Sequence, residues 1–182
     1  MTWFSPILIL LAAVLAVFWE SAFTGVRHFL GAQIDLLPAL MVYTSLSAGL
    51  VTVSLLAVLG GLWFDSLSAN PLGVTVLPLL ICGLLIYGSR ELILRDQTFA
   101  QLVLGFMASL AVPALVLIVL LTSGRQPLVG WGTFWQFLVM GVGGALFTPV
   151  FFAFFEFFNR VLGYNEPSQP SFRLDREIKR GR

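Results

Sequence analysis

Long apolar stretches follow one another along the chain, separated by short polar connections. A helix needs about 20 apolar residues to cross about 30 Å of hydrocarbon, and residues 3–23 meet this requirement. Trp3 and Trp19 lie near the two ends of this stretch, and amphipathic rings of this kind favour the membrane interfaces. The stretch therefore predicts a membrane-spanning helix, and the polar residues within 24–35 predict a connection at the surface.

Residues 36–64 are too many for one ordinary crossing, because a single helix of that length would measure about 43 Å. Ser45, Ser47 and Gly49 weaken the apolar signal near the middle, and small residues allow a tight turn there. We therefore expect two short helices with a break around residues 47–49, which gives six spans. One steeply tilted helix, and so five spans, is the alternative.

The remaining apolar stretches predict three more helices. Asn70 followed by Pro71 is typical of a helix start, with Asn70 as the N-cap and Pro71 at the first helical position. Two further spans are expected over 99–121 and 131–161. The pattern as a whole predicts an all-α protein, a polytopic transmembrane helical bundle formed by residues 1–162.

Composition agrees with a membrane protein. The chain is 58% hydrophobic and only 10% charged, against about a quarter charged residues in soluble domains. A net charge of +1 gives no field that would attract nucleic acid. Residues 163–182 differ, because they combine prolines with five basic side chains. We expect them to form a basic, disordered cytoplasmic tail.

Basic residues predict the topology through the positive-inside rule. A cytoplasmic tail also places Arg90, Arg95 and Arg160 inside, and with six spans it leaves Arg27 and Arg125 outside. With five spans Arg27 moves inside, which satisfies the rule slightly better. Helix length favours six spans, with both ends in the cytoplasm.

Catalysis requires polar groups that converge, and the sequence offers no such set. His28 is the only histidine, whereas zinc needs three or four ligands. Glu156 and Arg160 have an i, i+4 spacing that intramembrane proteases also use, and this raises the hypothesis of a hydrolase. Such a pair at the end of a helix ordinarily stabilises that end. We therefore predict a protein that is not an enzyme and that carries no catalytic residue, cofactor or metal.

Small residues along two helices predict contacts between helices. Ala12, Ala16 and Glu20 recur at four-residue spacing on one face of the first helix, and the partner of that face is either the bundle itself or another protein. A second small patch in the last helix consists of Gly141, Gly143, Gly144 and Ala145. The phenylalanines that follow are expected to face lipid; they are Phe147, Phe151, Phe152, Phe154, Phe155, Phe157 and Phe158.

Residues 60–73, GGLWFDSLSANPLG, are the most specific segment. Asp65 ends one apolar stretch, and the turn after it brings its carboxylate near the N-terminus of the next helix, where N–H groups favour negative charge. Asp65 is therefore expected to fasten a helical hairpin, and direct contact with a ligand or partner is the alternative. Asn70, Pro71 and Gly73 complete the candidate partner-facing hairpin.

This segment resembles the MreD-type rod shape-determining proteins of the bacterial inner membrane. The resemblance is carried by the paired glycines, Asp65, Leu67-Ser68 and Pro71-Leu72-Gly73, together with Asp35-Leu36-Leu37-Pro38 and the arginine-bearing connection 89–96. It implies a non-enzymatic scaffold of the cell-elongation complex. Such a scaffold binds the bitopic protein MreC and, with it, links the actin-like MreB to the RodA glycosyltransferase and its penicillin-binding transpeptidase.

The same resemblance supplies a competing hypothesis, because MreD-type proteins are similar in fold to the S-components of energy-coupling-factor transporters, which bind vitamins. Those proteins also use small-residue stripes on the first helix for partner contact. This hypothesis requires a polar pocket on the outer side of the membrane. The residues available to build it are Gln33, Asp35, Asp65, Ser66, Ser68 and Asn70.

Overall fold

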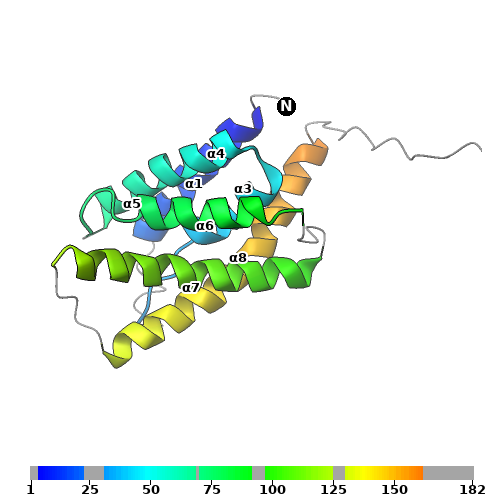
Figure 1. Cartoon of the computed structure of the whole chain (residues 1–182). Coiled ribbons are helices and arrows are strands. Elements are labelled where there is room, and N and C mark those ends of the chain that lie inside the picture. Colours follow the sequence, from blue (N-terminus) through cyan, green and yellow to red (C-terminus); the bar gives the residue numbers. More distant parts are fainter. Residues whose placement is uncertain (1–3, 23–30, 69, 92–96, 125–129, 162–182) are drawn as a thin grey trace, which may run out of the picture.

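A computed structural model describes residues 4–22, 31–68, 70–91, 97–124 and 130–161, and these residues form helices with no strand among them (Figure 1). In chain order the elements are α1 (Phe4–Ala22), α3 (Leu37–Ser47), α4 (Leu50–Leu55), the π-helical segment η1 (Leu56–Gly60), α5 (Gly61–Leu67), α6 (Val76–Gly88), α7 (Thr98–Thr122) and α8 (Trp131–Val161). The prediction of an all-helical protein is confirmed for the described residues.

Three helical stretches are long and apolar enough to cross a membrane. They are the continuous run Leu50–Leu67, which joins α4, η1 and α5, and the helices α7 and α8. Three further apolar stretches, Pro6–Ala22, α3 and α6, are shorter. The described chain thus has the helices of a membrane protein.

The long apolar segment is broken at the expected place. α3 ends at Ser47, where the N–H of Ala48 donates to the carbonyl of Thr44 over 2.8 Å. Ala48 and Gly49 are both extended, and α4 begins at Leu50. Two extended residues cannot continue a helix, so the chain turns and residues 37–67 form two separate helical arms.

Helix α3 occupies the centre of the bundle. Every residue from Leu37 to Leu46 is buried, and α3 contacts α1, α4, α6, α7 and α8. A helix that is apolar on all sides is stable only where other helices enclose it. Because other helices surround α3, this short helix is shielded from lipid over most of its surface. The polar groups at its backbone ends are therefore not left facing lipid.

The phenylalanines of α8 divide between two environments. Phe152 and Phe155 are both 3% exposed, and Tyr43 of α3 packs edge-on against Phe152 at 5.0 Å and stacks on Phe155 at 4.3 Å between ring centroids. The expectation that these two rings face lipid is therefore wrong. Residues three apart share one face of a helix, and this face of α8 is turned toward α3. Phe154 and Phe157 lie on the outer surface, as expected.

Helices α7 and α8 share the most extensive contact in the bundle. A side chain at Gly144 would collide with the Ser109 hydroxyl and lie 2.8 Å from the Gly105 carbonyl oxygen. A side chain at Gly105 would collide with the Thr148 hydroxyl and lie 2.6 Å from the Gly144 carbonyl oxygen. The small-residue patch of α8 therefore packs inside the bundle, where it lets two backbones approach closely.

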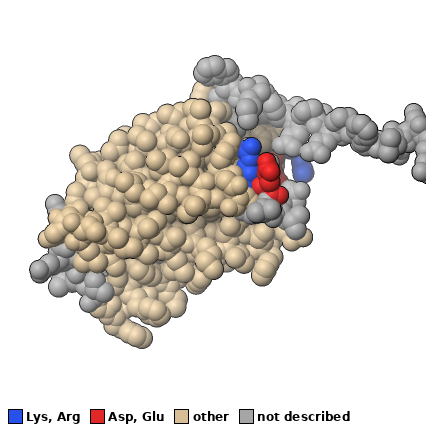
Figure 2. Space-filling model, viewed as in Figure 1, with Lys and Arg blue, Asp and Glu red and all other residues tan. Residues whose placement is uncertain are grey.

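The outer surface is strongly apolar. Large exposed side chains on α1 include Leu11 and Leu15, both 59% exposed, and on α8 they include Leu146 and Phe157, at 60% and 63%. In the space-filling view nearly all of the described surface lacks Lys, Arg, Asp and Glu, and those that are visible gather at one end (Figure 2). A surface of this kind suits hydrocarbon, because soluble monomers rarely expose large contiguous apolar patches.

Candidate functional site

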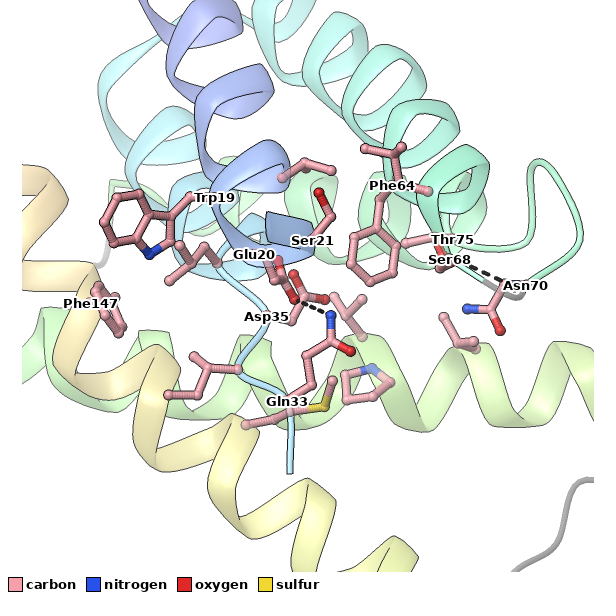
Figure 3. A pocket seen from close by; sticks show the side chains of 18 residues that line it. Trp19, Glu20, Ser21, Gln33, Asp35, Phe64, Ser68, Asn70, Thr75 and Phe147 are labelled. Atoms are coloured by element: carbon pink, nitrogen blue, oxygen red, sulfur yellow. Dashed lines mark hydrogen bonds between the residues drawn. The ribbon is translucent and has the colours of Figure 1, made fainter. Parts of the chain in front are cut away.

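A cavity of about 460 Å³ lies at the end of the bundle where α1 and α5 finish (Figure 3). Its polar wall comes from the ends of α1 and α5, the segment before α3 and the turn after α5, and consists of Glu20, Ser21, Gln33, Asp35, Ser68, Asn70 and Thr75. Its apolar wall includes side chains from α1, α5, α7 and α8, among them Val17, Phe64, Val112, Pro113, Met140 and Phe147. The cavity therefore combines one polar side with several apolar and aromatic ones.

Glu20 belongs to a hydrogen-bonded cluster that joins three parts of the chain. The side-chain amide of Gln33 donates to Glu20 Oε1 over 3.0 Å. The backbone N–H of Gln33 donates to Gln136 Oε1 over 3.1 Å, and Gln136 Nε2 donates to the carbonyl of Gln33 over 2.8 Å. Gln136 of α8 thus fixes the segment before α3 with two bonds, while the second carboxyl oxygen of Glu20 is buried without a hydrogen-bond partner.

Asp35 is buried, at 4% exposed, whereas the sequence predicted a surface position for it. Its Oδ1 accepts the N–H of Leu37 over 2.9 Å, so it satisfies one of the N–H groups that have no partner within the first turn of α3. Burial raises the pKa of the Asp35 carboxyl, the bond from Leu37 partly opposes this, and the charge of Asp65 adds to the rise.

This raised pKa predicts how stability changes with pH. The folded state holds the Asp35 proton more tightly than the unfolded state, so the contribution is fully present below the ordinary aspartate pKa of about 3.9 and is lost as pH rises through the raised value. Asp35→Asn should flatten this decline between acidic and neutral pH in thermal unfolding. Exposed Glu91→Gln is the control and should leave the decline unchanged. A wild-type melting temperature that rises over this range would contradict the assignment.

Asp65 fastens the hairpin that its sequence position predicted. The carboxylate is 1% exposed; its Oδ2 accepts the N–H of Thr75 over 3.0 Å, and its Oδ1 accepts the Thr75 hydroxyl. Gly61 permits this approach, since a side chain there would lie 2.9 Å from the Cα of Val76. Both oxygens of Asp65 are therefore used within the chain, and Asp65 does not line the cavity.

The helix after the hairpin starts later than the sequence predicted. Asn70 is not an N-cap and Pro71 is not in the first helical turn, because α6 begins at Val76 with Thr75 as its N-cap. The long-range bond from Thr75 to Asp65 sets the start, and residues 72–75 form turns instead. Gly73 has φ +88°, a backbone conformation that glycine adopts without strain. The partner-facing role expected for these residues stays a prediction.

The small-residue stripe of α1 faces the bundle. Ala16 is 7% exposed and Ala12 is partly buried against the core, where α1 contacts η1, α3 and α5. The same face continues to Glu20 at the end of the helix. The sequence left open whether this stripe packs inside the bundle or against another protein. In the described residues it packs inside the bundle.

Other sequence candidates lie apart from the cavity. Glu156 and Arg160 are both exposed near the end of α8, and no group of three or more metal-ligating side chains occurs among the described residues. Cys82 is buried in the core. His28, Arg27, Arg125 and the tail 163–182 lie outside the described residues.

The sequence identified part of the cavity and missed part. Gln33, Asp35, Ser68 and Asn70 line it as the ligand-binding hypothesis required, whereas Asp65 and Ser66 do not; Ser66 is exposed and its hydroxyl donates to the carbonyl of Trp63. Ser21 and Thr75, which also line the cavity, were missed, as was Gln136, which bonds to the backbone of Gln33 but does not itself line the cavity. The available signal was weak. Gln136 is a single polar residue in an apolar stretch, and such residues inside membrane helices usually have a partner.

No protein-family model, no curated protein and no solved structure matches this chain. The candidate function therefore depends on the sequence motif and on the geometry of the bundle.

Proposed function

We propose that this protein is a non-enzymatic membrane scaffold of the MreD type, which binds an MreC-like bitopic protein in the bacterial cell-elongation complex and helps to maintain cell shape and lateral wall synthesis. The observation that carries the proposal is the use of Asp65, the charged residue of the most specific motif. Both of its oxygens are bound to Thr75 inside the hairpin. A motif of this kind builds a rigid surface and leaves its carboxylate unavailable for chemistry.

The hairpin offers an apolar surface next to this fixed turn. Leu67 at the end of α5 is 50% exposed and Leu72 in the turn is 70% exposed. A transmembrane helix of a partner, at the point where it leaves the membrane, would bury both side chains. The small residues of α1 are already used inside the bundle, so the partner surface is assigned to the hairpin rather than to that stripe.

The proposal includes six membrane crossings with both ends in the cytoplasm of the inner membrane. Arg90 follows α6 and Arg160 is in the last turn of α8, so both would lie on the cytoplasmic side, as the positive-inside rule favours. The basic tail would then lie at the anionic inner leaflet or on a cytoplasmic partner such as an MreB-like filament. RodA-type glycosyltransferases and penicillin-binding transpeptidases are the further members of the proposed complex.

Co-purification tests the scaffold directly. The wild-type chain in nanodiscs should retain an MreC-like protein, and the double variant Leu67→Ala, Leu72→Ala should retain several-fold less, because contacts at the centre of an interface carry most of its free energy. Leu11→Ala, Leu15→Ala on α1 is the matched control and should retain the wild-type amount. Absence of the partner from the wild-type chain, under conditions that keep other membrane complexes intact, would contradict the proposal.

A second candidate function is favoured by the cavity. Its volume of about 460 Å³ falls within the range of about 300–1,000 Å³ that small-molecule sites occupy. The S-component hypothesis expected such a pocket from six residues, of which Gln33, Asp35, Ser68 and Asn70 line the cavity and Asp65 and Ser66 do not. We propose ligand binding as the alternative role, and the next subsection gives the class of ligand.

A further inference from the structure

The cavity carries an excess of acidic groups. Glu20 and Asp35 both line it, and their carboxyl groups lie close enough to interact electrostatically. Among the described residues of the lining there is no lysine, arginine or histidine. Isolated carboxylates in a low-dielectric site are costly unless a positive charge or hydrogen-bond donors balance them.

The hydrogen bonds of these groups leave part of their capacity unused. Glu20 Oε1 accepts from Gln33, while the other oxygen, Oε2, is buried with no partner. Asp35 uses Oδ1 for the N–H of Leu37. Glu20 lines the cavity, although its Oε2 is enclosed by protein atoms. Buried polar groups in folded proteins are nearly always paired, so this oxygen can accept a donor from a ligand once the side chain turns it toward the cavity.

The other walls suit an apolar body. Phe64 of α5, Pro113 of α7 and Phe147 of α8 line the cavity together with aliphatic side chains (Figure 3). Aromatic rings bind apolar surface and also attract cations through their π faces. The polar side is built from Glu20, Gln33 and Asp35, so one ligand would contact both surfaces at once.

We propose that this cavity binds a small organic cation, a protonated amine carried on an apolar, ring-bearing body. The ammonium group donates to the Glu20 carboxyl group and lies beside Asp35, and the ring packs against Phe64 and Pro113. This inference does not depend on the scaffold role, and it gives the second candidate function a ligand class. Asp65 takes no part, because Thr75 already occupies both of its oxygens.

Three probes of matched size separate charge from shape. They are 2-phenylethylamine, phenylacetate and 2-phenylethanol, which carry a positive, a negative and no charge on the same ring. Thermal unfolding of the full chain in nanodiscs should show saturable stabilisation by the amine only, because ligand that binds the folded state raises the melting temperature. Nanodiscs without protein correct for partition of the probes into lipid.

Variants then test whether Glu20 and Asp35 are the residues that bind the positive charge of the amine. Glu20→Gln and Asp35→Asn should each raise the Kd of the amine about tenfold or more, and Glu156→Gln, which removes an exposed carboxylate from α8 outside the cavity, should leave it unchanged. If either buried variant fails to fold, Asn70→Lys at the partly exposed rim tests the same charge requirement, with Asn70→Gln as its control. Asn70→Lys should weaken amine binding several-fold by repulsion.

Four outcomes would overturn the inference: equal stabilisation by all three probes, preference for phenylacetate, an unchanged Kd in every variant that alters the charge, or no stabilisation by the amine up to millimolar concentration. None of these results bears on co-purification with the MreC-like partner. Failure of the cation site and failure of the scaffold are therefore distinguishable.

Discussion

Asp65→Ala is expected to lower the free energy of unfolding by about 3 kcal/mol. The substitution leaves both the N–H and the hydroxyl of Thr75 without an acceptor, and each unsatisfied buried donor costs about 1–3 kcal/mol. It also removes the group that sets the start of α6. Denaturant titration of the chain in mixed micelles, followed by tryptophan fluorescence, measures the change.

Two further variants show whether the loss arises from this contact. Asp65→Asn retains an oxygen for the N–H of Thr75 and an amide donor for its hydroxyl, so it should cost only about 1 kcal/mol. Thr75→Val removes the hydroxyl alone. The free energy of unfolding that this substitution costs should be about 1 kcal/mol smaller in the Asp65→Ala background than in the wild type, because the effects of substitutions at contacting residues are not additive. Full additivity, or wild-type stability of Asp65→Ala, would show that the hairpin does not depend on this bond.

Gly144→Ala is expected to destabilise the bundle by about 2 kcal/mol, because overpacking a tight contact costs about 1–3 kcal/mol. The new methyl group would meet the Ser109 side chain and the Gly105 carbonyl, so α7 and α8 would have to separate. Thermal unfolding in the same nanodiscs measures the loss.

Gly132→Ala on the same helix is the matched control, since nothing lies within 4 Å of the position that its side chain would occupy. It should be neutral or slightly stabilising, as alanine favours a helix over glycine by up to about 1 kcal/mol. Ser109→Ala should restore only a small part of the stability of Gly144→Ala, because it removes the hydroxyl but leaves the Cβ of residue 109, which would also collide with the new methyl group. Equal effects of the two glycine variants would mean that helix propensity, and not close packing, determines the result.

Local signals in the sequence predicted the helices well. The bounds 131–161 of the last helix follow from an apolar run between polar connections, and the break at residues 47–49 follows from small residues in a segment too long for one crossing. Both features depend on neighbouring residues only. Hydropathy alone therefore supplies the order of the helices in the described part of the chain and the break between two of them.

Features that depend on distant contacts were predicted less well. The start of α6 is displaced from Asn70 to Val76, because Thr75 bonds to a residue ten positions earlier. Phe152 and Phe155 are buried because α3 lies against that face of α8. No periodicity in α8 alone identifies its neighbour, since α8 is apolar on every side.

The candidate site shows the same limit. Glu20 was singled out because a carboxylate near the end of an apolar helix is costly, but its contact with Gln33 and the proximity of Asp35 require the segment before α3 to fold over the end of α1. The chain between α1 and that segment carries no pattern that predicts this. The cavity thus follows from packing, while its polar residues were visible in the sequence.

Photo-cross-linking in intact cells tests the scaffold claim most directly. A photoreactive amino acid at position 72, on the exposed turn of the hairpin, should form a cross-link with an MreC-like bitopic protein, and the same group at position 15 on the outer face of α1 should not. Cross-links from position 72 to lipid alone, or equal cross-linking from both positions, would contradict the account.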